Sequence, residues 1–241
     1  MSTQPHEQET ADPFFDFYDR EDIAYGLKPS AELAAFLAQC SVTGKALDLG
    51  AGAGRDTLAL AEAGFDVTSV DASMRGLERI AQRAARRGLA ARVETLHQDV
   101  RDLQIPVRAY HAIVATTVLD HIPPDAAQRL WHKLVDGLND DGVLYVEVHT
   151  TDDPGCQAPD SNDPDAPVSE TAQWVINYFP PGFLLRMSAN QPRLRVLRYE
   201  ERYEWDYTHG PEHKHGKAIL LATTMSNNPN WFGHPEAFPR S

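Results

Sequence analysis

The glycine-rich run at residues 45–55, KALDLGAGAGR, constrains the fold of this chain more than any other segment. A short apolar stretch meets glycines at every second position, Gly50, Gly52 and Gly54, before an amphipathic segment begins. Because glycine has no Cβ, the backbone can turn sharply there and bring its N–H groups against a ligand. A loop of this kind between a strand and a helix is typical of α/β sheets that bind nucleotide-like molecules.

Strand and helix patterns alternate along most of the chain. After the strand that opens the glycine run, hydrophobic spacing predicts further strands at residues 65–71, 91–97, 112–117 and 143–149. Helices are expected at residues 29–40, 55–63 and 124–138, and another begins after Ser73 with Met74, Leu77, Ile80, Ala81 and Ala84 as its apolar face. This alternation predicts a parallel sheet with helices on both faces.

The C-terminal part has a different pattern. Residues 193–207 and 217–225 are β-rich, and the turn between them has no room for a crossover helix, so we expect an antiparallel hairpin. The predicted fold class is therefore α/β, with a doubly wound, mostly parallel, seven-stranded sheet that ends in a hairpin.

The balance of charged residues and cysteines limits the partners of the chain. Its 241 residues include 22 Lys and Arg against 35 Asp and Glu, a formal net charge of −13. A nucleic-acid binder presents a basic surface, so this charge argues against nucleic acid as a partner. Cys40 and Cys156 are too few for a disulfide framework or a structural zinc site, which fits a reducing compartment. No apolar run reaches the length of a membrane span, and we expect a soluble, cytoplasmic protein.

The length fits one α/β domain, which we expect over residues 13–226. Residues 1–12 are polar and acidic and lack the apolar region of a signal peptide, so they are predicted to be a disordered leader. Residues 227–241 are predicted to be a loosely ordered tail. Residues 150–169 are rich in Asp and Pro and are predicted to form a long loop near the site. A monomer and a homodimer are both compatible with the sequence.

The spacing of the glycines distinguishes between two classes of cofactor. In the Gly-x-Gly-x-x-Gly fingerprint of dinucleotide sites, the third glycine allows close packing of helix and strand. Arg55 occupies that place here, which weakens the prediction of a nicotinamide cofactor. Asp48 lies inside the strand, two residues before Gly50, where its carboxylate can accept hydrogen bonds from a cofactor that carries an amino-acid head.

The segment from Asp48 to Gly54, DLGAGAG, resembles the first motif of class I S-adenosylmethionine-dependent methyltransferases. Within that class the chain is most similar to the tellurite-resistance-type methyltransferases and their small-molecule relatives. The residues that carry this likeness are the segments 25–30, 54–56, 63–67 and 114–119. The resemblance implies a Rossmann-like methyltransferase fold with S-adenosyl-L-methionine as cofactor. Only the motifs in the cofactor-binding half of the chain are specific to this family.

The resemblance also implies roles for two acids. Asp71, at the end of the second strand, would hold the ribose hydroxyls, and a carboxylate at that place can accept from both. Asp99 would contact the adenine amino group, with the N–H of Val100 on the ring. The predicted cofactor-binding residues are Asp48, Gly50, Ala51, Gly52, Gly54, Arg55, Asp71, Ala72, Asp99, Val100 and Thr116. Structural alternatives are a cap at Asp71, for which Ser73 is the better candidate, a helix-start position for Arg55 and a surface position for Asp99.

The acceptor side is predicted from histidines and tyrosines. His209, His213 and His215 lie in the expected turn of the hairpin, and imidazoles can orient a substrate, accept a proton or bind a metal. A merely His-rich polar loop is the alternative. No stable metal site is expected, because no acid or cysteine lies at convincing ligand spacing. His121, after the fourth strand, is a further catalytic candidate, and the substrate candidates are Tyr18, Tyr25 and Tyr178.

These features predict methyl transfer to a small molecule, by in-line displacement onto a metalloid, a halide, a thiol or a small O or N nucleophile. Such a reaction needs mainly proximity, alignment and exclusion of water. The alternatives are a nicotinamide-dependent oxidoreductase and a non-catalytic protein that binds S-adenosylmethionine.

Overall fold

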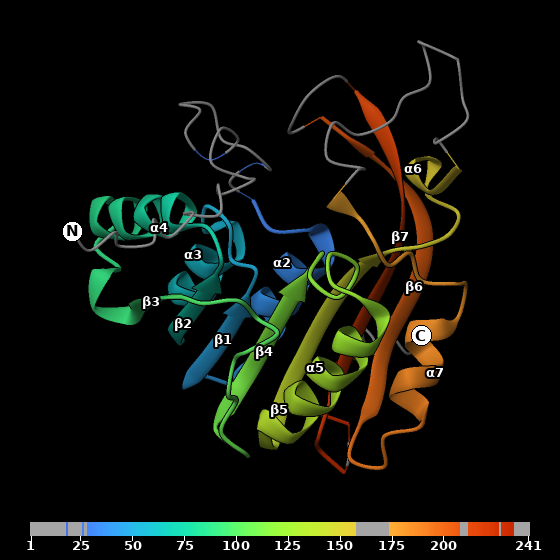
Figure 1. The fold of residues 1–241 in the computed structure, drawn as a ribbon. Coiled ribbons are helices and arrows are strands. Elements are labelled where there is room, and N and C mark those ends of the chain that lie inside the picture. The colour runs from blue at the N-terminus through green and yellow to red at the C-terminus, as the bar shows by residue number, and fades with distance from the viewer. Residues whose placement is uncertain are drawn as a thin grey trace, which may run out of the picture.

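A seven-stranded sheet forms the centre of the computed structural model, which describes residues 18, 26, 28–157, 174–207, 212–226 and 228–233. The strand order is β3-β2-β1-β4-β5-β7-β6 (Figure 1). The strands are β1 Lys45–Leu49, β2 Asp66–Asp71, β3 Val93–His97, β4 Tyr110–Thr116, β5 Leu138–His149, β6 Arg195–Asp206 and β7 His213–Thr223. The first five strands are parallel, and β7 is antiparallel to both β5 and β6. The predicted fold is confirmed.

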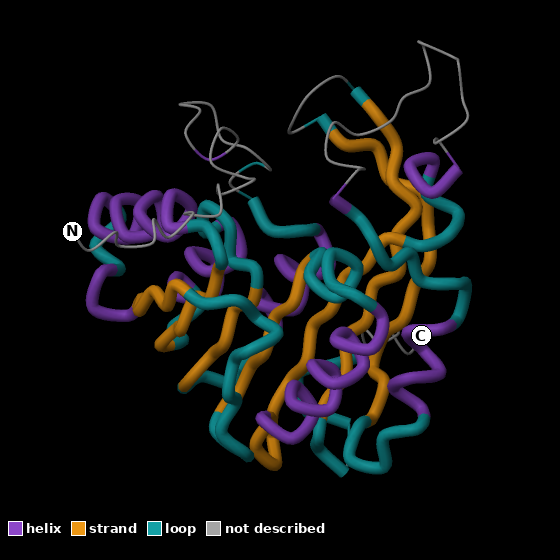
Figure 2. Tube along the Cα trace, in the orientation of Figure 1, coloured by secondary structure: helices purple, strands orange, loops and turns teal. Residues whose placement is uncertain are grey.

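Helices cover both faces of this sheet (Figure 2). They are α2 Ala31–Gln39, α3 Arg55–Glu62, α4 Met74–Arg86, α5 Pro124–Gly137, α6 Pro154–Gln157 and α7 Phe183–Ala189, with a 3-10 turn at Ala90–Arg92. One apolar cluster joins α5 and α7 to side chains such as Leu49 and Ile113. A second joins α2 and α3 to the opposite face, through Ala46 and Val114. Alternate residues of the central strands thus point into two cores.

The apolar face predicted for α4 was partly wrong. Met74 is 50% exposed and Ala81 is also exposed, and the buried residues of the helix are Gly76, Leu77, Ile80 and Ala84. The helix packs on β2 and on β3, which is an edge strand of the sheet, so a narrow stripe suffices to cover it. The sequence also gave no signal for α7, which begins after Gly182 without a side-chain cap.

The hairpin is longer than predicted, and its tip carries part of the site. The predicted turn began near residue 206, but β7 already starts at His213, so His213 and His215 are strand residues. Both are buried, because Asp153 and the short helix α6 pack over them. Polar residues in a buried strand are easily taken for a turn, since turn predictions rely on low hydropathy.

The carboxyl ends of β1, β2, β4 and β5 meet at one edge of the sheet, the upper edge in Figure 1. Because β6 runs parallel to these strands, the tip of the hairpin projects at the same edge, as expected (Figure 1). Among the described residues, no helix is both long and apolar enough to cross a membrane. The leader 1–12 and most of the tail 227–241 lie outside the described residues, and the expected domain limits stay predictions.

Candidate active site

A cavity of about 470 Å³ opens at this edge and extends from the glycine loop to the hairpin. Its volume is that of a typical small-molecule or cofactor site. Ten of the eleven predicted cofactor residues line it: Asp48, Gly50, Ala51, Gly52, Arg55, Asp71, Ala72, Asp99, Val100 and Thr116. The sequence therefore located one end of the cavity well.

The glycine loop depends on backbone conformations that side chains disfavour. Gly52 has φ +51°, and a Cβ there would lie 2.8 Å from the Tyr18 hydroxyl oxygen. Gly54 has φ +91°, and a Cβ there would lie 2.8 Å from Ile80 Cγ1. Gly54 is absent from the cavity lining and caps the start of α3, so its role is to pack this helix against α4. Its predicted place at the cofactor stays a prediction.

Asp71 ties the glycine loop to the start of α4. Its Oδ2 accepts a hydrogen bond from the Gly52 N–H at 2.8 Å, and its Oδ1 accepts one from the Ser73 N–H at 2.7 Å. Ser73 caps the helix itself, since its Oγ accepts from the Gly76 N–H at 3.1 Å. Each carboxylate oxygen has a second lone pair, and Asp71 lines the cavity, so it can also accept from a diol.

Asp48 is an acid in an environment that disfavours its charge. Only 2% of the residue is exposed, and the Thr57 hydroxyl donates to its Oδ2 at 2.5 Å. Burial, with the nearby Asp56 as a second cause, raises the pKa of Asp48 to about 8. The buried Thr116 hydroxyl has no hydrogen-bond partner among the described residues. Both groups are therefore suited to a ligand with positively charged or hydrogen-bonding atoms.

Two arginines at the cavity are held by neighbouring acids. Arg55 binds Asp56 through its Nε and Nη2, at 3.0 Å and 3.2 Å. Arg101 binds the Asp99 carboxylate, and these hydrogen bonds keep the pKa of Asp99 below its usual value. Asp99 therefore remains an ionised acceptor at the mouth of the cavity.

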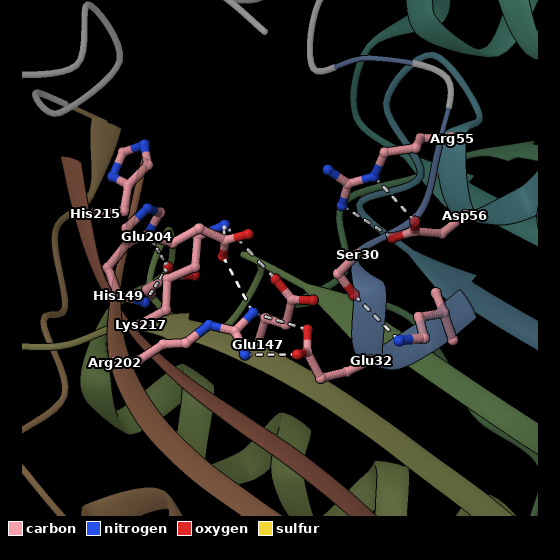
Figure 3. Close-up of polar contacts among 12 residues, drawn as sticks. Ser30, Glu32, Arg55, Asp56, Glu147, His149, Arg202, Glu204, His215 and Lys217 are labelled. Atoms are coloured by element: carbon pink, nitrogen blue, oxygen red, sulfur yellow. Dashed lines mark hydrogen bonds and ion pairs between the residues drawn. The ribbon is translucent and has the colours of Figure 1, made fainter. Parts of the chain in front are cut away.

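Histidines from three segments gather at the hairpin end of the cavity. His121 follows β4, His149 ends β5 and His215 lies in β7, and all three line the cavity. The ring centroids of His121 and His149 are 6.2 Å apart, and those of His149 and His215 are 4.6 Å apart. Figure 3 shows His149 and His215 across the cleft from Arg55 and Asp56.

Asp120, which is fully buried, orients two of these rings. Its Oδ2 lies 2.5 Å from His149 Nδ1, and its Oδ1 lies 3.3 Å from His121 Nδ1. Burial raises the pKa of Asp120, but the two histidines more than offset this and the pKa is lowered. Burial lowers the pKa of His121, whereas the Asp120 charge more than offsets it, so the net shift is upward. The pKa of His121 is thus raised by a fixed carboxylate.

A network of ion pairs lies between the glycine-loop end and the hairpin end of the cavity. Lys217, which lines the cavity, has its Nζ 3.8 Å from Glu147 Oε2 and 3.5 Å from Glu204 Oε2. Arg202 of the same hairpin makes a bidentate ion pair with Glu32 of α2, at 2.5 Å and 3.0 Å (Figure 3). These contacts fix the hairpin against the sheet and the first described helix.

Of the remaining predicted site residues, some line the cavity and some do not. Tyr18 lines the cavity, but His213 and Tyr178 do not. His213 is fully buried behind His215, and the Tyr178 hydroxyl is buried without a partner among the described residues. His209 and Tyr25 lie outside the described residues.

Several lining residues are not among the predicted ones, and of these His149 and Asp206 matter most. His149 ends the fifth strand, and the rule that sites form at the carboxyl ends of parallel strands was a usable signal for it. Asp206 ends β6, which runs parallel to the first five strands, so the same rule was a usable signal for it. Thr117, directly after β4, has φ +53°. This backbone conformation is strained for any residue other than glycine, and such residues are common at functional sites.

Comparisons with known proteins agree with this geometry. Residues 46–142 match the family model described as a methyltransferase domain. This segment, from β1 into β5, is therefore similar to a methyltransferase domain. The matched segment contains the glycine loop, Asp71 and Asp99, and the predictions of an S-adenosylmethionine-dependent family and of this cofactor are confirmed. A search of curated proteins finds no match.

Solved structures show the same fold at low sequence identity. TehB from Haemophilus influenzae is 20% identical with a TM-score of 0.65, over 81% of this chain and 62% of TehB. The Burkholderia thailandensis 1,6-didemethyltoxoflavin-N1-methyltransferase, solved with 1,6-didemethyltoxoflavin and S-adenosylhomocysteine, is 21% identical with a TM-score of 0.59, over 81% of this chain and 78% of that chain. The [4+2]-cyclase SpnF is 18% identical with a TM-score of 0.56, over 81% of each chain. The methyltransferase domain thus has a fold that also serves other chemistry.

Proposed function

We propose that this protein transfers a methyl group from S-adenosylmethionine to a small-molecule acceptor bound at the hairpin end of the cavity. One observation carries the proposal: a single cavity joins the glycine loop and its acids to the histidines of the hairpin side. Transfer requires both molecules side by side with water excluded, and one cavity that spans both ends supports this arrangement.

The cofactor half of the cavity suits the groups of a sulfonium nucleoside. Asp71 is assigned to the ribose hydroxyls, and Asp99 with the Val100 N–H to the adenine, as the family resemblance implies. Asp48 and the unpartnered Thr116 hydroxyl are assigned to the amino-acid head. The cofactor supplies a methyl carbon that already carries a good leaving group. The protein therefore contributes chiefly alignment and desolvation.

The acceptor half is assigned to His121, His215 and Tyr18. His121 is the proposed base for an acceptor that must lose a proton, because Asp120 orients its ring and raises its pKa. An anionic acceptor needs no base. The proposal includes a metalloid, a halide, a thiol and a small O or N nucleophile as acceptors, with no nucleic-acid partner. It places the protein in the cytoplasm, as a monomer or a homodimer.

The test is incubation with methyl-labelled S-adenosylmethionine and a panel of tellurite, selenite, halides, thiols, phenols and amines. Labelled products, including volatile ones, are then identified by mass spectrometry. We expect S-adenosylhomocysteine to form together with one labelled class of product. Tight binding of the cofactor without any labelled product would contradict the proposal and favour a non-catalytic binding protein.

The other alternative is a nicotinamide-dependent oxidoreductase. Arg55 stands where a dinucleotide fingerprint has its third glycine, and its pairing with Asp56 holds a bulky side chain at the start of α3. We therefore expect S-adenosylhomocysteine, and not NADH, to raise the melting temperature. The reverse result would support the oxidoreductase.

A further inference from the structure

The tip of the β6–β7 hairpin brings together three groups that ligate metals. Asp206, His213 and His215 each offer a ligand atom, and these atoms all lie within 4.8 Å of one another. Asp206 is the register partner of His213 across the hairpin, and His213 and His215 are two residues apart on the same face of β7. The cluster is therefore a property of strand register as well as of local sequence.

The geometry of the two imidazoles fits a shared ion. His213 Nε2 and His215 Nε2 are 3.0 Å apart. Two nitrogens bound to one tetrahedral zinc at 2.0–2.1 Å lie about 3.3 Å apart, close to this distance. Two imidazoles and one carboxylate are also a donor set that suits Zn²⁺ and neighbouring divalent transition metals.

His215 has the outer contact that metal-binding histidines normally have. Its Nδ1 lies 3.0 Å from Asp153 Oδ2, an arrangement that orients the ring and leaves Nε2 as the ligand atom. Asp153 is 2% exposed and also accepts hydrogen bonds from the Gly155 and Gly216 N–H groups. A Cβ on Gly216 would lie 2.6 Å from the Asp153 backbone nitrogen, so glycine permits this approach.

We propose that Asp206, His213 and His215 form a divalent transition-metal site, for which Zn²⁺ is the best fit. Asp206 and His215 line the cavity, so a coordination position left open by three protein ligands would face the acceptor. No metal was predicted from the sequence, because no acid or cysteine lies at convincing ligand spacing near the histidines. The fold supplies Asp206 from the opposite strand and Asp153 from another segment.

The second part of the proposal rests on the proposed methyl transfer. An acceptor whose thiol or hydroxyl binds the ion releases its proton more readily, to His121 or to water, and becomes a thiolate or an alkoxide. Its sulfur or oxygen then forms a bond to the methyl carbon. The bond between that carbon and the sulfonium sulfur breaks, and its electron pair stays on sulfur. No oxidant or reductant is required.

A different set of ligands is also close enough to consider. His149, Asp153 and His215 likewise have ligand atoms within 4.8 Å of one another. Both Asp153 oxygens already accept hydrogen bonds from the main chain, and His149 Nδ1 is held by Asp120. These contacts favour Asp153 and His149 as neighbours of the ion rather than its ligands. His149→Gln separates the two arrangements, because it removes a ligand from only one of them.

The test uses tag-free, full-length protein and Zn²⁺ alone. We expect one equivalent of Zn²⁺ to bind in competition with a chelator and to raise the melting temperature. His213→Gln, His215→Gln and Asp206→Asn should each weaken Zn²⁺ binding by at least about 100-fold, and Asp153→Asn by about 10–100-fold, as is usual for outer contacts. The matched controls His132→Gln and Asp140→Asn, at exposed sites, should bind Zn²⁺ like the wild type.

Substitution with Co²⁺ tests the coordination directly, because its visible spectrum reports coordination number and changes when an acceptor thiol binds. The affinity for S-adenosylhomocysteine, measured for every variant by calorimetry, shows that the variant is folded. A hydrogen-bonded histidine pair without a metal is the opposing interpretation. This interpretation holds if the wild type binds Zn²⁺ no more tightly than His215→Gln does. It also holds if His149→Gln loses Zn²⁺ binding while Asp206→Asn retains it. If Zn²⁺ binds as expected but no acceptor is methylated, the metal site stands and the proposed function fails.

Discussion

The two ends of the cavity are built in different ways. The glycine-loop end uses main-chain conformation within residues 48–55, together with Asp71, which ends β2, and Asp99, which follows β3. The hairpin end uses side chains from the segment after β4, from the end of β5 and from the β6–β7 hairpin, which lie far apart in the sequence. The first end therefore follows from a local pattern, whereas the second depends on how distant segments pack. Changes at one end should leave the binding properties of the other intact.

The largest effect is expected at His121. His121→Ala should lower turnover of a hydroxyl acceptor by about 100-fold, the lower end of the usual range for general-base catalysis. A base must be neutral to accept a proton, so wild-type turnover should rise with pH through a pKa above 6.5. Initial rates over a pH series check this, with the exposed His132→Ala as control. An unchanged pH profile in His121→Ala would remove it from the base role.

The next effect tests the other end of the cavity. Asp71→Ala should weaken S-adenosylmethionine binding at least tenfold, consistent with about 1.5–3 kcal/mol for hydrogen bonds to a charged group. Calorimetry measures the affinity, and Asp66→Ala, at the exposed start of the same strand, is the matched control. Zn²⁺ binding should not change. Equal affinity in Asp71→Ala and wild type would show that the carboxylate serves contacts within the protein, such as those with the Gly52 and Ser73 N–H groups, and not the cofactor.

Gly52→Ala separates backbone strain from cofactor binding. A Cβ at this positive φ costs the folded state about 1–2 kcal/mol. It would also lie 2.8 Å from the Tyr18 hydroxyl oxygen, so the loop and Tyr18 must shift, and we expect cofactor affinity to fall. Gly88→Ala is the matched control, because Gly88 has φ +71° with open space around its Cβ position. Both variants should lose thermal stability. If Gly88→Ala loses cofactor affinity as well, general destabilisation explains the effect.

The smallest effect concerns Asp48. Because its pKa in the folded protein is raised to about 8, the folded state holds a proton that the unfolded state releases, and stability falls as pH rises from about 4 to 8. Asp48→Asn should remove this slope and raise the free energy of unfolding at pH 8 by at least about 1 kcal/mol, or about 2–4 °C in Tm. Thermal unfolding across pH measures it. A steeper slope in the variant would contradict the assignment.

Much of the fold could be predicted because its signals are local. Strand and helix periodicity, the cap at Ser73 and the glycine spacing act over a few residues, and the carboxyl ends of parallel strands then place Asp71 and Asp99. The exposed Met74 and Ala81 show the limit of such signals. Periodicity identifies an apolar face, but the width that is buried depends on the surface beneath it.

The glycine-loop end of the cavity can be placed from a local pattern, because the backbone geometry of Gly52 and the positions of Asp48 and Asp71 follow from one βαβ unit. The hairpin end depends instead on long-range packing. Pairing of β6 with β7 places Asp206 opposite His213, and folding of the loop after β5 brings Asp153 to His215, 62 residues away. Contacts over such separations depend on strand register and loop packing, which no short stretch of sequence encodes.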